Sequence, residues 1–152
     1  MTVGYLVASL VDTNILVYCF DSRELAKRAI ARETLRQGAA ERVIHIPHQA
    51  LIEFISVVTR RRGHGAAMLT EEEATRQAEG FMADFPVLYP NDRVFRTALF
   101  GMATYRLPWY DAHLWAYAEH YGLPEILSED FTHERMYGTV RIRNPFAVVG
   151  LA

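Results

Sequence analysis

Residues 6–18 read LVASLVDTNILVY, in which a short apolar run meets the polar trio Asp12, Thr13 and Asn14 before apolar residues resume. A short apolar run bounded by polar residues is typical of a strand that is buried on both faces. We therefore predict a buried strand over 6–11 that leads into a loop and the start of a helix. The polar trio would lie at the carboxyl end of this strand.

Helix-like and strand-like patterns alternate along the rest of the chain. Thr70 with Glu73 forms a capping box at one helix start, and Gly38 follows another helical pattern as a stop signal. The expected helices cover 25–37, 47–62, 71–84, 92–105 and 109–122, and the expected further strands cover 43–46, 87–88, 125–127 and 140–142. This alternation predicts an α/β fold.

The predicted fold is one three-layer α/β domain over residues 1–152, with a mainly parallel sheet of about five strands covered by helices on both faces. A chain of 152 residues is long enough to bury one core and short for two ordinary domains. In such sheets the ligand crevice lies beyond the carboxyl ends of the strands. Asp12 and Asp130 both follow predicted strands.

Composition excludes several classes of protein. The formal net charge of -2 argues against binding nucleic acid by a global positive field, although local patches remain open. A single cysteine, Cys19, excludes an intramolecular disulfide and a multi-cysteine zinc site, and favours a reducing compartment. The apolar opening 4–20 is interrupted by the polar trio and lacks a positively charged leader, so we expect no membrane segment and a cytoplasmic protein.

Two aspartates share one sequence setting. Asp12 directly follows a predicted apolar strand. Asp130, in Ser128-Glu129-Asp130-Phe131, follows another such strand and is separated from it by two polar residues. A lone carboxylate at the edge of a core is costly unless it is hydrogen-bonded, paired or bound to metal. The simple alternative in each case is a helix cap or a turn.

Two further acids lie in predicted helices. Glu53 lies within the apolar stretch 51–55, which leaves little exposed surface for a solvated glutamate, so we expect it to face a cleft. A contact with Gln49 or an ion pair with an arginine would also explain it. Asp111 falls in the first turn of its helix, where the helix dipole favours a carboxylate whether or not it does chemistry.

The combination of these acids points to a metal site. A parallel sheet would bring Asp12, Glu53, Asp111 and Asp130, hereafter the four acids, to one crevice. Clustered carboxylates repel one another, and a hard divalent cation with oxygen ligands relieves that repulsion. Such a site suits the attack of water on a phosphodiester.

These residues resemble the PIN-domain nucleases, and in particular the VapC-type toxins of bacterial type II toxin–antitoxin pairs. The resemblance extends over nearly the whole chain. The motifs that carry it are Val11-Asp12-Thr13-Asn14-Ile15-Leu16-Val17-Tyr18, Ile46-Pro47 with Glu53, Tyr110-Asp111-Ala112, Ser128-Glu129-Asp130-Phe131 and Asn144-Pro145-Phe146.

The resemblance implies an endoribonuclease that depends on Mg²⁺ or Mn²⁺ and hydrolyses RNA. It implies that the four acids hold metal and water, and that Thr13, Asn14 and Ser128 hydrogen-bond to the acids or to substrate. It also implies a homodimer and a cognate antitoxin that covers the site, often with an inserted arginine or lysine. Glu129 is a possible fifth acid, but its position relative to Ser128 favours Asp130.

Other interpretations stay open. Aspartyl-phosphate phosphohydrolases also place an aspartate after the first strand, but Asn14 stands where they need a second aspartate, and no lysine follows Asp111. A non-catalytic RNA- or protein-binding module on the same fold is a third reading, since fold alone does not give function. Residues 60–62 (RRR) could contact RNA or an antitoxin, or could simply form a solvated helix end.

Overall fold

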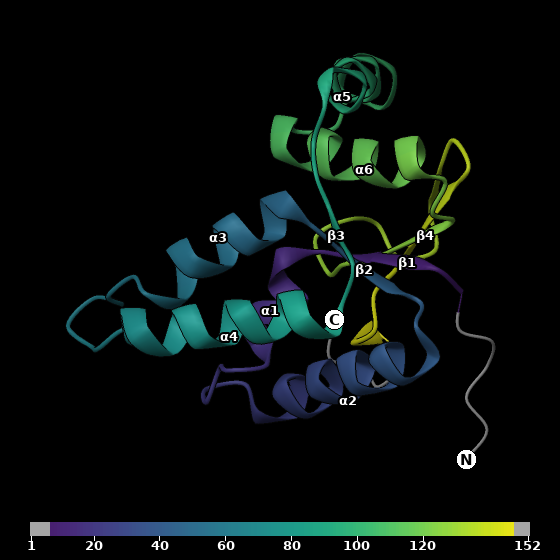
Figure 1. The fold of residues 1–152 in the computed structure, drawn as a ribbon. Helices are drawn as coiled ribbons and strands as arrows, with labels where there is room; N and C mark the ends of the chain where they lie inside the picture. The colour runs from purple at the N-terminus through teal and green to yellow at the C-terminus, as the bar shows by residue number, and fades with distance from the viewer. Residues whose placement is uncertain (1–6, 148–152) are drawn as a thin grey trace.

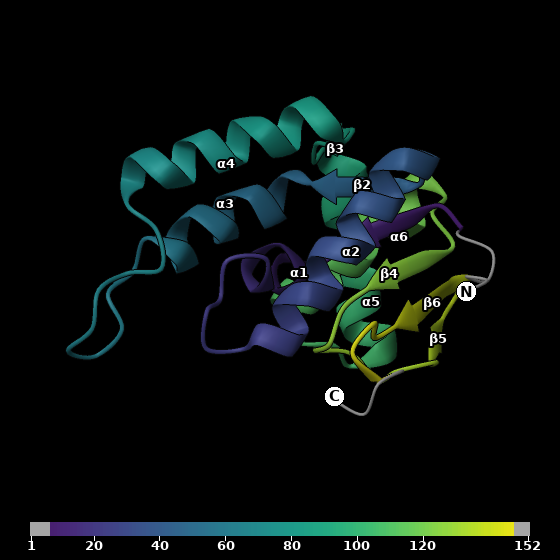
Figure 2. The ribbon, with the colours of Figure 1, turned by 90° about the horizontal axis from the view of Figure 1, so that it is seen from below.

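The computed structural model describes residues 7–147 and forms one sheet with helices on both faces (Figures 1 and 2). Its six strands lie in the order β3-β2-β1-β4-β6-β5, and only the β5–β6 pair is antiparallel. The strands are β1 (Ser9–Val11), β2 (Ile44–Pro47), β3 (Val87–Leu88), β4 (Glu125–Leu127), β5 (Met136–Tyr137) and β6 (Val140–Arg143). The predicted α/β fold with a mainly parallel sheet is confirmed.

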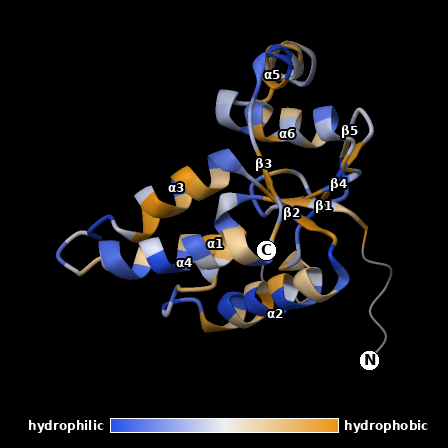
Figure 3. Ribbon diagram, in the orientation of Figure 1, coloured by the Kyte–Doolittle hydropathy of each residue, from blue (hydrophilic) through white to orange (hydrophobic). Residues whose placement is uncertain are grey.

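The helices divide between the two faces of the sheet. They are α1 (Thr13–Tyr18), α2 (Leu25–Glu41), α3 (His48–Val58), α4 (Glu71–Asp84), α5 (Asp92–Tyr105) and α6 (Trp109–Tyr121). Helices α1 to α4 share one apolar cluster, and α5 and α6 share a second one on the other face. Figure 3 shows that α3 and the central strands are strongly hydrophobic, whereas α2 and α4 also carry many hydrophilic residues.

Most predicted elements occur, with differences that have local causes. The capping box of Thr70 and Glu73 begins α4 as predicted. The predicted stop at Gly38 is wrong, because α2 continues to Glu41 and ends with Arg42 in the left-handed conformation at φ 57°. Gly38 instead packs so closely against Ile44 of β2 that a Cβ atom would collide with it. Close helix–sheet packing therefore explains this glycine.

Other ends of elements also differ from the prediction. Helix α3 ends at Val58, earlier than the expected 47–62, with Thr59 as its C-cap. Strand β5 was not predicted, because residues 131–139 were expected to form a loop or a short helix. The first strand begins at Ser9, and Leu6, which the prediction included, lies outside the described residues.

The register of the sheet sets where polar side chains emerge. Strand β1 lies between β2 and β4, and Val11 is paired with Leu127. The backbone N–H of Asp12 donates to the carbonyl oxygen of Leu127 at 2.9 Å. The residues that follow β1 and β4, beginning with Asp12 and Ser128, therefore emerge side by side at the same edge of the sheet.

Two further findings concern Cys19 and the length of the helices. Cys19 is buried, and this burial raises the pKa of its thiol to about 12, as befits a packing residue. None of the helices within residues 7–147 has both the length and the apolar character that crossing a membrane requires.

Candidate active site

Asp12 is a buried carboxylate held by two strong hydrogen bonds. The backbone N–H of Thr13 donates to its Oδ1 at 2.6 Å, and Ser128 Oγ donates to its Oδ2 at 2.6 Å. Burial raises its pKa to about 7; repulsion from Asp130 and Glu53 adds to the rise, and the Ser128 hydrogen bond opposes it. Asp12 does cap α1, but a cap alone does not require two neighbouring acids.

Asn14 connects the carboxylates at the ends of β1 and β4. Its Nδ2 donates to Asp130 Oδ2 at 3.1 Å and lies 3.4 Å from both Asp12 Oδ2 and Ser128 Oγ. The backbone N–H of Asp130 donates to Ser128 Oγ at 3.0 Å. Asn14 and Ser128 thus hold Asp12 and Asp130 in one hydrogen-bonded group, where electrostatic repulsion alone would separate them.

Glu53 reaches the same group from α3. Thr13 Oγ1 donates to its Oε2 at 3.0 Å, and Gln49 Nε2 donates to its Oε1 at 2.8 Å. The contact with Gln49, which sequence alone offered as an alternative to a functional role, therefore coexists with a contact to the polar trio. The half-buried Glu53 is held from both sides.

Asp111 completes the cluster from the first turn of α6. Partial burial raises its pKa, and repulsion from Asp130 and then Glu53 raises it further. In the part of the chain that the structure describes, its side chain forms no hydrogen bond or ion pair. The four acids thus belong to one electrostatic cluster assembled from four separate segments.

Glu129, the possible fifth acid, is occupied elsewhere. Its carboxylate pairs with Lys27 Nζ at 2.9 Å and accepts a hydrogen bond from the Tyr18 hydroxyl. The Lys27 ammonium also lies over the Tyr18 ring, 5.0 Å from its centroid. Because Lys27, the single lysine of the chain, neutralises Glu129, the charge of Glu129 adds little to the repulsion among the four acids.

The donors at this site fit a hard divalent cation. They are carboxylate oxygens with few compensating positive charges, and burial, with repulsion from Asp130 and Glu53, raises the pKa of Asp12. Asn14 Oδ1 is buried and has no hydrogen-bond partner within residues 7–147, so it can accept a hydrogen bond from water or ligand. As the side chains stand within residues 7–147, no three or more acidic, histidine or cysteine side chains lie close enough together to hold a metal ion. The fit to a hard ion therefore lies in the chemistry of these oxygen donors and not in a preformed coordination geometry.

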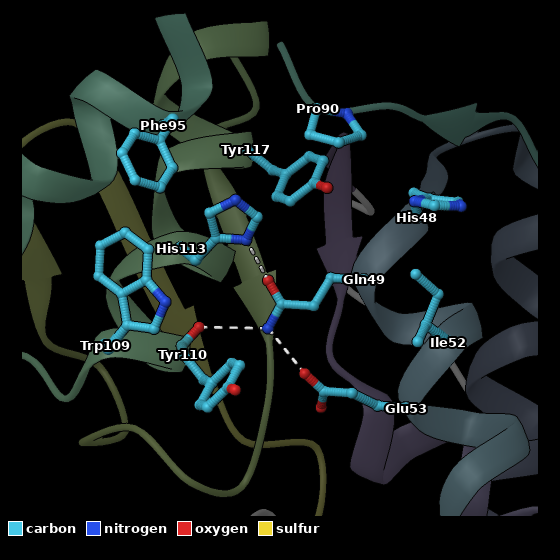
Figure 4. Close-up of a pocket in the computed structure, with 10 residues that line it drawn as sticks. All are labelled: His48, Gln49, Ile52, Glu53, Pro90, Phe95, Trp109, Tyr110, His113 and Tyr117. Carbon is cyan, nitrogen blue, oxygen red and sulfur yellow. Dashed lines mark hydrogen bonds between the residues drawn. The ribbon is translucent and has the colours of Figure 1, made fainter. Parts of the chain in front are cut away.

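A pocket of about 380 Å³ adjoins the four acids. Figure 4 shows its ten lining residues, among which Glu53 is shared with the acid cluster. Gln49 Nε2 donates to Glu53 and, at 3.3 Å, to the Tyr110 carbonyl oxygen, while Gln49 Oε1 contacts His113 Nδ1. Gln49 thus links the wall of the pocket to the acid cluster.

The wall of this pocket was not predicted from the sequence. Trp109, His113 and Tyr117 recur every four residues and therefore share one face of α6. This spacing was the available signal. The rings of Trp109 and His113 lie 5.9 Å apart, and those of His113 and Tyr117 lie 5.2 Å apart.

Two of the arginines at 60–62 form contacts of their own. Arg62 pairs with Asp21 at 3.6 Å, and Arg60, which follows the end of α3, donates a hydrogen bond to Ser56 on that helix. His48, which lines the pocket, packs against Tyr89 with ring centroids 5.1 Å apart. These contacts are structural, although the exposed guanidinium of Arg60 remains available to a partner.

Comparison with known proteins places these features in context. A family model described as the PIN domain matches residues 9–138. A search of the curated proteins found no significant match.

Among solved structures, a toxin–antitoxin complex from Klebsiella pneumoniae is similar with a TM-score of 0.63 and 17% identity over 90% of this chain and 97% of that one. A DNA-bound VapBC from Salmonella typhimurium has a TM-score of 0.68 and 16% identity, over 92% of this chain and 99% of that one. The Mycobacterium tuberculosis toxin VapC20, which cleaves the sarcin–ricin loop, has a TM-score of 0.60 and 14% identity, over 95% of this chain and 96% of that one. At these identities the likeness concerns the fold.

Proposed function

The chain belongs to the PIN-domain family, and on this premise we propose that it is a divalent-metal-dependent endoribonuclease whose reaction centre is formed by the four acids. The observation that carries the proposal is the convergence of Asp12, Glu53, Asp111 and Asp130 from distant segments into one cluster of mutually repelling carboxylates. Folded proteins rarely maintain such a cluster without a cation or a catalytic use for it.

The four acids would hold Mg²⁺ or Mn²⁺. When bound, the ion would act as a Lewis acid. It would lower the pKa of bound water and neutralise the negative charge that develops on the phosphate. The second group of residues, Thr13, Asn14 and Ser128, positions the acids. Ser128 and the Thr13 N–H orient Asp12, Asn14 restrains Asp130, and Thr13 Oγ1 with Gln49 restrains Glu53.

The chain's own polar atoms would then serve the substrate. Asn14 Oδ1, which is buried and unpartnered among the described residues, can accept a hydrogen bond from the attacking water or from a ribose hydroxyl. The exposed carboxylate of Asp130 and the half-buried one of Asp111 lie where they can orient water at the scissile phosphate. A carboxylate with a raised pKa, such as Asp111, is suited to accept a proton.

We further propose that the protein acts as the toxin of a toxin–antitoxin pair in the cytoplasm. The resemblance of its motifs and the fold shared with toxin–antitoxin complexes support this. A negatively charged cluster would attract a basic side chain of an antitoxin, which would compete with the metal for the same carboxylates.

A homodimer is part of the same proposal. Phe95, Leu99 and Met102 lie on one face of α5 at spacings of four and three residues, and all three are exposed. Leu99 and Met102 do not line the pocket, and a second copy of the chain would cover this part of the face while leaving the pocket open.

The rival functions receive less support. The amide of Asn14 is directed at Asp130 and stands in place of the second aspartate that an aspartyl-phosphate enzyme needs. A non-catalytic binding module gains nothing from four acids that repel one another. It nevertheless remains the interpretation to adopt if the metal-dependent activity is absent.

The proposal is tested by incubating mixed cellular RNA with the purified protein in Mg²⁺ or Mn²⁺, in EDTA, and with Asp12→Asn. Asp92→Asn is the matched control, because Asp92 is an exposed carboxylate in the first turn of α5, away from the cluster. We expect metal-dependent cleavage by the wild type and by the control, and none by folded Asp12→Asn. Equal activity of wild type and Asp12→Asn, or equal inactivity, would overturn the proposal.

A further inference from the structure

We propose that the pocket between α3, α5 and α6 binds one unstacked base of a single-stranded RNA, next to the phosphodiester on which the four acids act (Figure 4). The inference rests on the proposed function for its substrate class. It adds a binding site and the residues that form it.

The first argument is the position of the pocket. Glu53 belongs both to the acid cluster and to the pocket lining, and Gln49 bridges Glu53 to His113 and to the Tyr110 carbonyl oxygen. A nucleotide with its phosphate at the acids therefore has the pocket immediately beside it. Single-stranded RNA is recognised mainly through bases that are splayed out of the stack in this way.

The second argument is the shape and chemistry of the walls. Trp109, His113 and Tyr117 form a row of rings along one face of α6, and Phe95 packs edge-on against Trp109 with centroids 5.3 Å apart. Half of the Phe95 surface is exposed. An exposed aromatic ring such as that of Phe95 can bind a nucleobase by stacking, and stacking of this kind has no strong sequence preference.

The third argument is charge and size. Among the described residues that line the pocket there is no lysine or arginine, so nothing there would recognise a phosphate or another anion. A neutral planar ring suits this environment. The volume of about 380 Å³ lies in the lower part of the range of roughly 300–1,000 Å³ that is usual for small-molecule sites.

The fourth argument is a hydrogen-bonding group that remains available. Gln49 Nε2 faces two acceptors, the Glu53 carboxylate and the Tyr110 carbonyl, so Gln49 Oε1 must accept from His113 Nδ1. In the neutral ring His113 Nε2 is then an acceptor, and Figure 4 shows it on the side of the ring away from Gln49. Each of the four bases carries an N–H donor, so this atom would anchor a base without selecting one.

The experiment measures binding of the labelled hexamers A₆, C₆, G₆ and U₆ in EDTA, where cleavage is not needed for the readout. Phe95→Ala and Phe100→Ala form the matched pair, because both side chains are on α5, are 49% and 57% exposed, and contact one aromatic ring edge-on, while only Phe95 lines the pocket. We expect Phe95→Ala to weaken binding about tenfold, as loss of one stacking partner does, and Phe100→Ala to leave it unchanged.

Two further variants separate stacking from self-association. Trp109→Ala should weaken binding and Trp109→Phe should restore most of it, because a ring still faces the base. Leu99→Ala alters the exposed face of α5 without touching the pocket lining, and its sedimentation is compared with that of Phe95→Ala. Equal weakening by Leu99→Ala and Phe95→Ala would assign the effect to association and overturn the inference, as would unchanged binding by Phe95→Ala and Trp109→Ala.

The outcomes for the pocket and for the catalytic proposal are distinct. Pocket-dependent hexamer binding without metal-dependent cleavage by any variant would contradict the nuclease and leave the base site standing. Cleavage that needs metal and Asp12 but shows the same KM in Phe95→Ala, Phe100→Ala and wild type would contradict the base site alone.

Discussion

Ser128 Oγ donates a 2.6 Å hydrogen bond to Asp12 Oδ2 across the ends of two adjacent strands, although 116 positions separate the two residues in the chain. Hydrogen bonds to a charged, buried carboxylate are among the stronger ones in proteins, at about 1.5–3 kcal/mol. The Ser128 hydroxyl therefore favours the ionised form of Asp12.

Replacement of this hydroxyl is the first prediction. We expect Ser128→Ala to raise the pKa of Asp12 further and to weaken Mn²⁺ binding at pH 7 by about tenfold. Titration calorimetry with Mn²⁺ measures the effect, and Ser56→Ala, an exposed serine on α3, is the control. Unchanged Mn²⁺ affinity in folded Ser128→Ala would contradict this role.

The raised pKa of Asp12 predicts a pH dependence of stability in EDTA. Its folded-state pKa of about 7 exceeds the ordinary value of 3.8, so the folded protein binds the proton more tightly than the unfolded chain. The stability that Asp12 gives the folded state by binding this proton is fully present below pH 4. It is lost as the pH rises to about 7, at about 1.4 kcal/mol per pH unit.

The measurement is urea unfolding at pH 5 and pH 8 in EDTA, for wild type and Asp12→Asn. We expect wild type to lose more stability than the variant between the two pH values, because only the wild type has this carboxyl group. Excess Mg²⁺ at pH 8 should restore wild-type stability selectively. If the unfolding free energies of the two proteins change equally with pH, folding does not raise the pKa of Asp12 and the prediction is wrong.

Two glycines in helices have opposite surroundings, and we therefore expect their replacement by alanine to have opposite effects on stability. A Cβ atom at Gly101 would lie 2.5 Å from the Trp115 ring, whereas one at Gly80 of α4 would meet nothing within 4 Å. We expect Gly101→Ala to destabilise the fold by about 1–3 kcal/mol through overpacking, and Gly80→Ala to stabilise it by up to about 1 kcal/mol. Chemical denaturation measures both, and a stabilising Gly101→Ala would refute the close helix contact.

The exposed face of α5 predicts the oligomeric state. We expect the wild type to sediment as a dimer at micromolar concentration and Leu99→Glu to sediment as a monomer, since a charge would be buried in the apolar interface. Met82→Glu, on the exposed surface of α4, is the matched control and should remain dimeric. A monomeric wild type would rule out the homodimer.

Much of the fold and the candidate site could be predicted from local sequence. The apolar run before Asp12 and the acid after β4 were sufficient to place two carboxylates at one edge of a parallel sheet, because the edge follows from strand direction alone. The pairing of Glu129 with Lys27 was not predictable, since 102 positions separate the two residues. The same holds for the contact of His113 with Gln49, which depends on how α6 packs beside α3. Contacts across elements are set by packing, which a local pattern does not encode.

The position of β4 in the sheet has a consequence for synthesis on the ribosome. This strand comes late in the chain yet lies beside β1, the first strand, and Ser128 and Asp130 follow it directly. A nascent chain that has emerged only through α6 lacks the partner of β1, the hydroxyl that orients Asp12 and one of the four acids. The proposed reaction centre can therefore form only after the segment through Asp130 has left the ribosome, so a partner made at the same time can meet the earlier part of the chain before it is able to cut RNA.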